Sequence, residues 1–133
     1  MASLVTNKGK YKILGWAFVN STIPTNFYLA LFTSATAPTV DINTFSELTQ
    51  INTGNGYTTG GYSLSPGATD FDVWTEDDSN DWALVQLKDI VWTATGDLPN
   101  GGDGARYACL TDDNGTEASR EIYASFDLVS DRS

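Results

Sequence analysis

Histidine is absent from this sequence, and cysteine occurs once, as Cys109. Because histidine is the usual general base near neutral pH, its absence excludes Ser-His-Asp and Cys-His catalytic arrangements. It also removes the commonest ligand of zinc and iron, and a single thiolate builds neither a metal site nor a disulfide within one chain. We therefore expect a protein that is not an enzyme, that holds no cofactor or metal ion, and that packing or assembly stabilises.

Basic residues are also few, and long apolar runs are missing. Seven Lys and Arg face seventeen Asp and Glu, which gives the 133 residues a net charge of −10. A surface of this sign repels the phosphate backbone, so we expect no nucleic-acid partner. The densest apolar stretch, residues 13–19, is too short to cross a membrane, and no cleavage site of a secretion signal follows it. We expect no membrane contact, and synthesis in a reducing cytoplasm.

The charge is divided unevenly along the chain. Residues 1–40 contain three lysines and no acid, whereas residues 41–133 contain all seventeen acids and four basic residues. The first part therefore carries +3 and the remainder −13. We interpret residues 1–133 as one domain, in which an N-terminal arm or helix at 1–24 precedes a β-sandwich body at 25–133.

Residues 6–20 have the pattern of a short helix with a threonine or asparagine cap at its start. Tyr11, Leu14 and Phe18 recur at helical spacing. Two glycines lower the helix propensity of the segment, so the helix would be marginal alone. We expect its apolar face to hold it in place by packing.

The lysines of this segment form the one basic cluster in the chain. They are either a solvated helix face, on which only Lys8 and Lys12 share a side, or a docking site for an acidic partner surface. In the second interpretation the arm binds another copy of the protein or a larger assembly, and Trp16 anchors it to the neighbouring subunit. The candidate partner-docking residues are Lys8, Lys10, Tyr11, Lys12 and Trp16.

After Pro24 the pattern changes to that of short strands separated by turns. The apolar run at 27–33 predicts a central strand that is covered on both sides. The sum of the pattern predicts a mainly β fold: a β-sandwich or jelly-roll-like domain behind a short N-terminal helix or arm. Other strand-like runs lie at 62–64, 71–75 and 82–95 (with a break near 88–89), and 45–51 fits either a helical turn or a strand.

The last two strands are predicted from clean alternation at 105–111 and 121–128. The Asp-Asp-Asn-Gly sequence at 112–115 predicts a hairpin between them, in which Asn and Gly supply positive φ angles, and hence an antiparallel pair. In the final strand we place Ile122, Ala124 and Phe126 on one face, and Tyr123 and Ser125 on the other.

Acidic and aromatic clusters leave other chemistries open. Residues 76–81 and 112–115 offer oxygen ligands for calcium, but the order of an EF-hand is lacking in the first, and a solvated turn is the favoured interpretation of both. Asp70, Asp72 and Glu76 offer carboxylates for glycoside hydrolysis, yet nothing in the sequence brings carboxylates from separate strands together. The four tryptophans form either a sugar-stacking platform or parts of the core and interfaces.

Several short motifs follow one another in a definite order. The chain opens with TNKGKYKIL and continues with FYLALFTSATAPT, a Glu-Leu at 47–48, and a Gly-Tyr at 56–57 or 61–62. DIVWTAT, DLPNGGDG and ARYACLTDD come later. This succession, from Val5 to Leu128, resembles small bacteriophage virion proteins with an LTN-x-G helix start and an LYLALFT strand. The acidic stretch at 65–81 departs from the pattern like an insertion.

The resemblance implies a virion structural protein without catalytic residues, which is a capsid decoration (cement) protein or a tail or neck component. We favour a homo-oligomeric decoration protein that is assembled in the host bacterial cytoplasm. It would bind the major capsid protein, or another virion structural protein, and stabilise the assembled lattice. The alternatives are a tail or neck component and a carbohydrate- or receptor-binding β-sandwich module.

Overall fold

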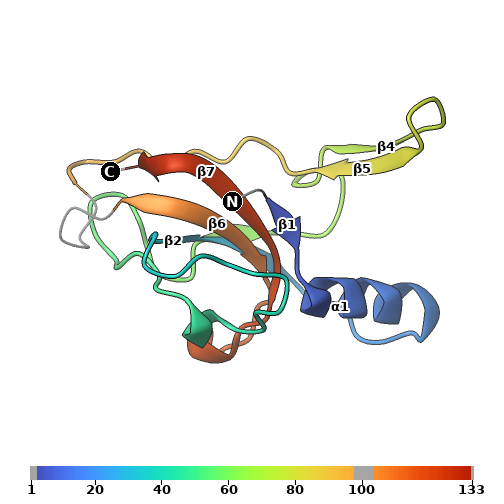
Figure 1. Ribbon diagram of the computed structural model, residues 1–133, viewed down its shortest axis with the longest axis horizontal. Coiled ribbons are helices and arrows are strands. Elements are labelled where there is room, and N and C mark those ends of the chain that lie inside the picture. Colours follow the sequence, from blue (N-terminus) through green and yellow to red (C-terminus); the bar gives the residue numbers. More distant parts are fainter. Residues whose placement is uncertain (1–2, 98–103, 133) are drawn as a thin grey trace.

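The computed structural model describes residues 3–97 and 104–132, and of Asp131 only the backbone. The fold is mainly β, with a short N-terminal helix and antiparallel sheets (Figure 1). Five strands form one sheet in the order β1-β7-β6-β2-β3, and two strands form a separate hairpin, β4-β5. The strands are β1 (Leu4–Val5), β2 (Phe27–Phe32), β3 (Tyr62–Leu64), β4 (Val73–Asp77), β5 (Trp82–Gln86), β6 (Ala105–Thr111) and β7 (Ile122–Arg132). Helix α1 spans Asn7–Phe18, and the single 3₁₀ turns η1 and η2 lie at Phe45–Glu47 and Glu117–Ser119.

Strand β2 is the central apolar strand that the sequence predicts, and the prediction is confirmed. It pairs antiparallel with β3 on one side and with β6 on the other. Its side chains alternate between two apolar clusters, one on each face of the sheet. The first cluster comprises Phe27, Leu29, Leu31, Ile51, Tyr57, Leu64, Ala105, Ala108 and Tyr123, and the second comprises Ala30, Phe32, Ile42, Phe45, Leu48, Tyr107, Cys109 and Ile122.

The segment between β2 and β3 covers the face of the second cluster. Of the two alternatives for residues 45–51, the helical turn is confirmed, because η1 begins at Phe45. The Glu47 carboxylate closes this turn by accepting the backbone N–H groups of Asn43 and Thr44 at 2.7 and 2.8 Å. The Phe45 ring then packs edge-to-face on Phe32, with 5.0 Å between ring centroids.

Strands β6 and β7 form the predicted antiparallel pair, but the connection between them differs from the predicted hairpin. It is longer and includes η2, and neither Asn114 nor Gly115 has a positive φ angle. The expectation of a tight turn on these two residues is therefore wrong. The carboxylate of Asp112 closes the loop instead, because its Oδ1 accepts the backbone N–H of Glu121 at 3.1 Å.

A β-bulge corrects the alternation that we predict for β7. Thr111 pairs with Ile122, but the preceding residue Leu110 pairs with Ala124, which leaves Tyr123 as an extra residue. Ile122 consequently joins the second cluster, and Tyr123 joins the first. The placement of Ile122 and Ala124 on one face is wrong because the inserted residue interrupts the period of two.

The predicted helix is confirmed as α1. The expectation that its apolar face packs on the rest of the chain is wrong. Helix α1 follows β1, which pairs with β7 at the edge of the sheet, and projects away from the body (Figure 1). Tyr11, Leu14 and Phe18 are 69%, 57% and 81% exposed. Residues of the opposite side are buried or half-buried, namely Lys8, Gly9, Lys12, Gly15 and Trp16.

The hairpin β4-β5 projects as a second arm, separate from α1 (Figure 1). Its first strand begins two residues later than the predicted run at 71–75, and its second ends at Gln86 instead of continuing to 95. The chain then crosses the face of the first cluster without strand pairing, and Leu87, Ile90 and Trp92 pack there. Most of the DLPNGGDG motif, at 97–104, lies outside the described residues.

Candidate docking surface

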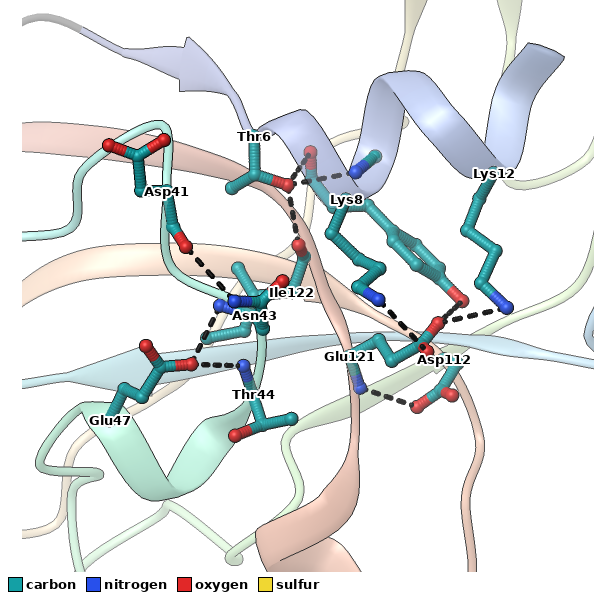
Figure 2. A network of polar contacts seen from close by, with 12 residues as sticks. Thr6, Lys8, Lys12, Asp41, Asn43, Thr44, Glu47, Asp112, Glu121 and Ile122 are labelled. Atoms are coloured by element: carbon teal, nitrogen blue, oxygen red, sulfur yellow. Dashed lines mark hydrogen bonds and ion pairs between the residues drawn. The ribbon is translucent and has the colours of Figure 1, made fainter.

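Helix α1 begins directly on the bulge of β7. The Thr6 hydroxyl caps the helix by accepting the N–H of Gly9 at 2.9 Å, and it donates to the Ile122 carbonyl at 2.6 Å (Figure 2). The Thr6 N–H donates to the Tyr123 carbonyl at 3.0 Å. The N-cap of the helix is thereby bonded to the bulge itself, which fixes the direction in which α1 leaves the sheet.

Gly9 allows the helix to approach the strand closely. A Cβ atom at this position would lie 2.2 Å from the carbonyl oxygen of Tyr123, which no side chain tolerates. In the sequence Gly9 only lowers helix propensity. In the structure it is the residue that permits α1 to lie against β7.

The fold divides the lysines of α1 into two groups. The ammonium groups of Lys8 and Lys12 lie 3.8 and 3.2 Å from the carboxylate of Glu121, just before β7 (Figure 2). The hydroxyl of Tyr123 donates to the same carboxylate at 3.3 Å. Lys10 is exposed and has no ion-pair partner in the part of the chain that the structure describes. Two lysines therefore hold α1 to its own chain, and Lys10 faces solvent.

Trp16 anchors α1 within its own chain. Its ring meets Phe27 and Tyr123 edge-to-face, with centroid distances of 5.7 and 5.6 Å. Its indole N–H donates to the Thr22 carbonyl at 3.1 Å. Each such aromatic pair contributes about 0.5–1.5 kcal/mol beyond the area that it buries. Of the five candidate docking residues, only Lys10 and Tyr11 are exposed.

The opposite side of α1 presents large apolar side chains to solvent. Tyr11, Leu14 and Phe18 follow the spacing i, i+3, i+7 and so share one side, which we call the outward face. Lys10 borders it, one turn before Leu14, and is exposed as well. An exposed apolar surface of this kind marks an interaction site in soluble proteins.

The hairpin β4-β5 presents a second exposed surface, of which the sequence offered Glu76 only as a carboxylate and Trp74 only as one of four tryptophans. Trp74 lies opposite Val85 in the ladder, so both side chains point to the same side. They are 88% and 61% exposed, and Glu76 lies on that side too. We call Trp74, Glu76 and Val85 the hairpin face. An isolated two-stranded hairpin is marginally stable at best, so further packing on this face would stabilise it.

Two hollows with apolar walls adjoin the hairpin face. The larger, about 650 Å³, opens between the sheet and the segment after β5, and Leu31, Trp92 and Phe126 are among the residues that line it. The smaller, about 390 Å³, lies between β1, α1 and the base of the hairpin. Val85 borders both, so the hairpin face continues into the surface of the hollows.

A salt bridge between the residues that flank the hairpin closes its base, and a ring contact ties this base to β3. The Lys88 ammonium lies 2.5 Å from the Asp70 carboxylate and 5.2 Å from the centroid of the Tyr62 ring. Asp70 also accepts the Ser65 N–H at 2.7 Å. The hydrogen bond from Lys88, with that from Ser65, holds the pKa of Asp70 below its usual range. The hairpin is therefore anchored at its base and free at its tip.

The acidic turn at 76–81 has the hydrogen bonds of a reverse turn, as the favoured interpretation expects. The Asp77 carboxylate accepts the side-chain amide of Asn80 at 2.8 Å and the N–H of Ser79 at 2.9 Å. These bonds lower the pKa of Asp77. Across residues 3–97 and 104–132 there is no group of three or more Asp, Glu or Cys side chains placed to hold a metal ion.

Within the described ranges, no helix is both long and apolar enough to cross a membrane. Comparison of the chain with protein-family models, with curated proteins and with solved structures finds no match. The outward face of α1 and the hairpin face are therefore the structural features from which a function can be inferred.

Proposed function

We propose that this chain is a non-enzymatic structural protein of a bacteriophage virion, and that it decorates the capsid. The observation that carries the proposal is the outward face of α1, where Tyr11, Leu14 and Phe18 are exposed. Exposure of this apolar area is unfavourable in a single chain, whereas an assembled state removes it from water. The motifs that resemble phage virion proteins begin at this same helix.

Physical arguments about charge and repeated contacts support decoration. A protein that binds only the assembled lattice stabilises that lattice by mass action, and repeated copies multiply weak contacts. The proposed partner is the major capsid protein or another virion structural protein, met during assembly in the host bacterial cytoplasm. The −13 charge of residues 41–133 would face outward and keep particles apart.

The finer architecture also belongs to the proposal. One face of the five-stranded sheet is partly covered by the segment that follows β5, with an apolar hollow between them. We propose that this segment and the β4-β5 hairpin form the second layer of a β-sandwich-like body, which becomes complete when a partner covers the hairpin.

A binding experiment with particles tests the proposal. Purified protein should co-sediment with particles that lack it, at a copy number on the order of hundreds set by lattice symmetry. The Phe18→Asp variant should lose this binding, because it places a charge on the outward face. The control is Val129→Asp, since Val129 is 79% exposed on β7, away from α1. Equal coating by Phe18→Asp and the wild-type protein would refute the proposal.

The tail or neck alternative differs from decoration in stoichiometry. A tail or neck component would use the same surfaces, but in far fewer copies per particle. Gel densitometry of purified particles separates the two, since it measures the copy number relative to the major capsid protein.

Trp74 favours one alternative of a different class. An indole that is 88% exposed on strand β4 resembles a sugar-stacking side chain, as a carbohydrate- or receptor-binding module would have. This candidate predicts that the free protein binds glycans on an array and that Trp74→Ala abolishes the binding. Absence of glycan binding by the wild-type protein removes the candidate.

A further inference from the structure

We propose that the outward face of α1 in one copy packs on the hairpin face of a second copy of the chain, head to tail. The inference rests on the proposed function in one respect, since it takes the outward face as an assembly surface. It goes further by naming the occupant of that surface and the second surface that receives it.

The charges of the two elements are complementary. Helix α1 contains three lysines and no acid, whereas residues 72–86 contain five acids and no basic residue. Lys8 and Lys12 are paired with Glu121, but Lys10 is exposed beside the outward face. The acids of the hairpin are Asp72, Glu76, Asp77, Asp78 and Asp81. The acidic segment 72–86 is therefore complementary in charge to the basic helix α1.

The shapes and apolar side chains also match. Twelve residues of helix extend about 18 Å, and five residues of strand extend about 17 Å, so the helix can lie along the hairpin. Side chains at i, i+3 and i+7 are the anchors by which helices dock on apolar surfaces. Tyr11, Leu14 and Phe18 supply them, and Trp74 with Val85 supplies the receiving surface. A helix placed there would also cover the edge of the two hollows that Val85 borders.

The structure does not make this contact within one chain, because Phe18 and Trp74 are 81% and 88% exposed. The Thr6 cap and the ring packing of Trp16 fix the direction of α1, and the Lys88–Asp70 pair fixes the base of the hairpin. The two elements project from the body as separate arms (Figure 1). Each copy therefore offers one donor surface and one acceptor surface, which is a heterologous interface that closes into a ring or grows as a chain.

Light scattering after gel filtration, with two single variants and their mixture, tests this arrangement. The wild-type protein should assemble beyond the monomer. Phe18→Asp removes the donor surface and Trp74→Asp the acceptor, and each should weaken association at least about 30-fold and run as a monomer. Both side chains are more than 80% exposed, so neither change disturbs the core. Val129→Asp is the matched control and should assemble like the wild-type protein.

The 1:1 mixture of the two variants is the decisive sample. Trp74→Asp still has an intact α1 and Phe18→Asp still has an intact hairpin, so the mixture should form a dimer and stop there. A charge swap tests the contact between Lys10 and Glu76. Lys10→Glu should weaken assembly about five-fold, and adding Glu76→Lys in the same chain should restore assembly.

Three results would overturn the inference: a mixture that stays monomeric, a Trp74→Asp variant that assembles like the wild-type protein, or a wild-type protein that is monomeric at about 1 mM. The particle-binding experiment separates this failure from that of the proposed function. If Phe18→Asp loses particle binding while the free wild-type protein is monomeric, only the head-to-tail contact is refuted. If the wild-type protein assembles but does not bind particles, the decoration function is refuted.

Discussion

Strand β2 and helix α1 are both rich in large apolar residues, yet the fold uses them in opposite ways. In β2 the side chains of both faces are covered by the chain itself, and Phe32 has no exposed surface. In α1 the two glycines, Lys8, Lys12 and Trp16 are on the buried side, and Phe18 is 81% exposed. The sheet therefore buries its apolar side chains within one chain, whereas the helix leaves one apolar side exposed to water in the single chain.

The largest expected effect is the difference in stability between variants of Phe32 and of Phe18. Phe32→Ala should lower the free energy of unfolding by about 3–5 kcal/mol, because it empties a fully buried site against Phe45. Phe18→Ala should change it by less than about 0.5 kcal/mol, because the side chain is in water. Urea denaturation of the two variants measures both values. Equal losses would mean that α1 packs by its apolar face after all.

The next effect concerns how α1 meets the sheet. Gly9→Ala should destabilise the protein by about 1–3 kcal/mol, although alanine favours helices, because its Cβ would meet the Tyr123 carbonyl. Gly15→Ala is the control in the same helix, since its Cβ would meet only the Ser21 hydroxyl, which can rotate away. Thermal unfolding should rank Gly9→Ala below the wild-type protein and Gly15→Ala at or above it. The reverse order would contradict the described contact of α1 with β7.

The stability of the sheet should depend on pH through one ion pair. The Arg106 side chain lies 2.9 Å from the Asp127 carboxylate and holds the pKa of Asp127 well below its usual range. A lowered folded-state pKa contributes stability above the unfolded value, about 3.9, and that stability is lost as the pH falls through the folded pKa. Asp127→Asn should flatten the fall in Tm between about pH 4 and pH 2. Asp78→Asn, which removes one carboxylate from the exposed turn, is the matched control for the loss of a charge.

The carboxyl group of Asp112 should change the stability of the fold with pH in the opposite direction. Burial raises the pKa of this carboxyl, so its charged form costs stability at neutral pH, and protonation recovers it as the pH falls through the raised value. A Tm profile of Asp112→Asn should therefore lack this gain on acidification. Because the side chain also closes the β6–β7 loop, the comparison is of the slope with pH and not of the absolute Tm.

The smallest effect belongs to the ion pairs that hold α1. Glu121→Gln removes the partner of Lys8 and Lys12, whose side chains are partly exposed, and should cost at most about 1 kcal/mol. The loss should shrink as salt is added, because salt screens surface charges. Glu76→Gln on the hairpin is the control and should have no effect on the free monomer. A loss for Glu121→Gln that is independent of salt would show that the carboxylate acts through hydrogen bonds instead.

The sequence predicted the elements of the sheet better than the surfaces of the molecule. Strand β2 and the pair β6–β7 could be read from apolar runs and alternation, because burial on a sheet imposes these patterns. The bulge at Tyr123 could not be read, since one inserted residue depends on what packs from elsewhere in the chain, here the Thr6 cap.

The orientation of α1 could not be predicted either. Periodicity shows which residues share a side, but it does not show whether that side meets the protein's own sheet or a partner. The deciding contact is the approach of Gly9 to the Tyr123 backbone, which joins residues more than a hundred positions apart. The exposure of the hairpin face could not be predicted for a similar reason, because its alternating pattern is that of an ordinary half-buried strand.

Hydrogen–deuterium exchange of residues 7–18, in the dilute free chain and in the assembled particle, shows whether the outward face of α1 docks in the particle. We expect fast exchange in the free chain, where α1 projects into solvent, and strong protection in the particle, with β2 equally protected in both. If α1 exchanges at the same rate in both states while the protein is bound to the particle, its outward face is not the docking surface and the account is wrong.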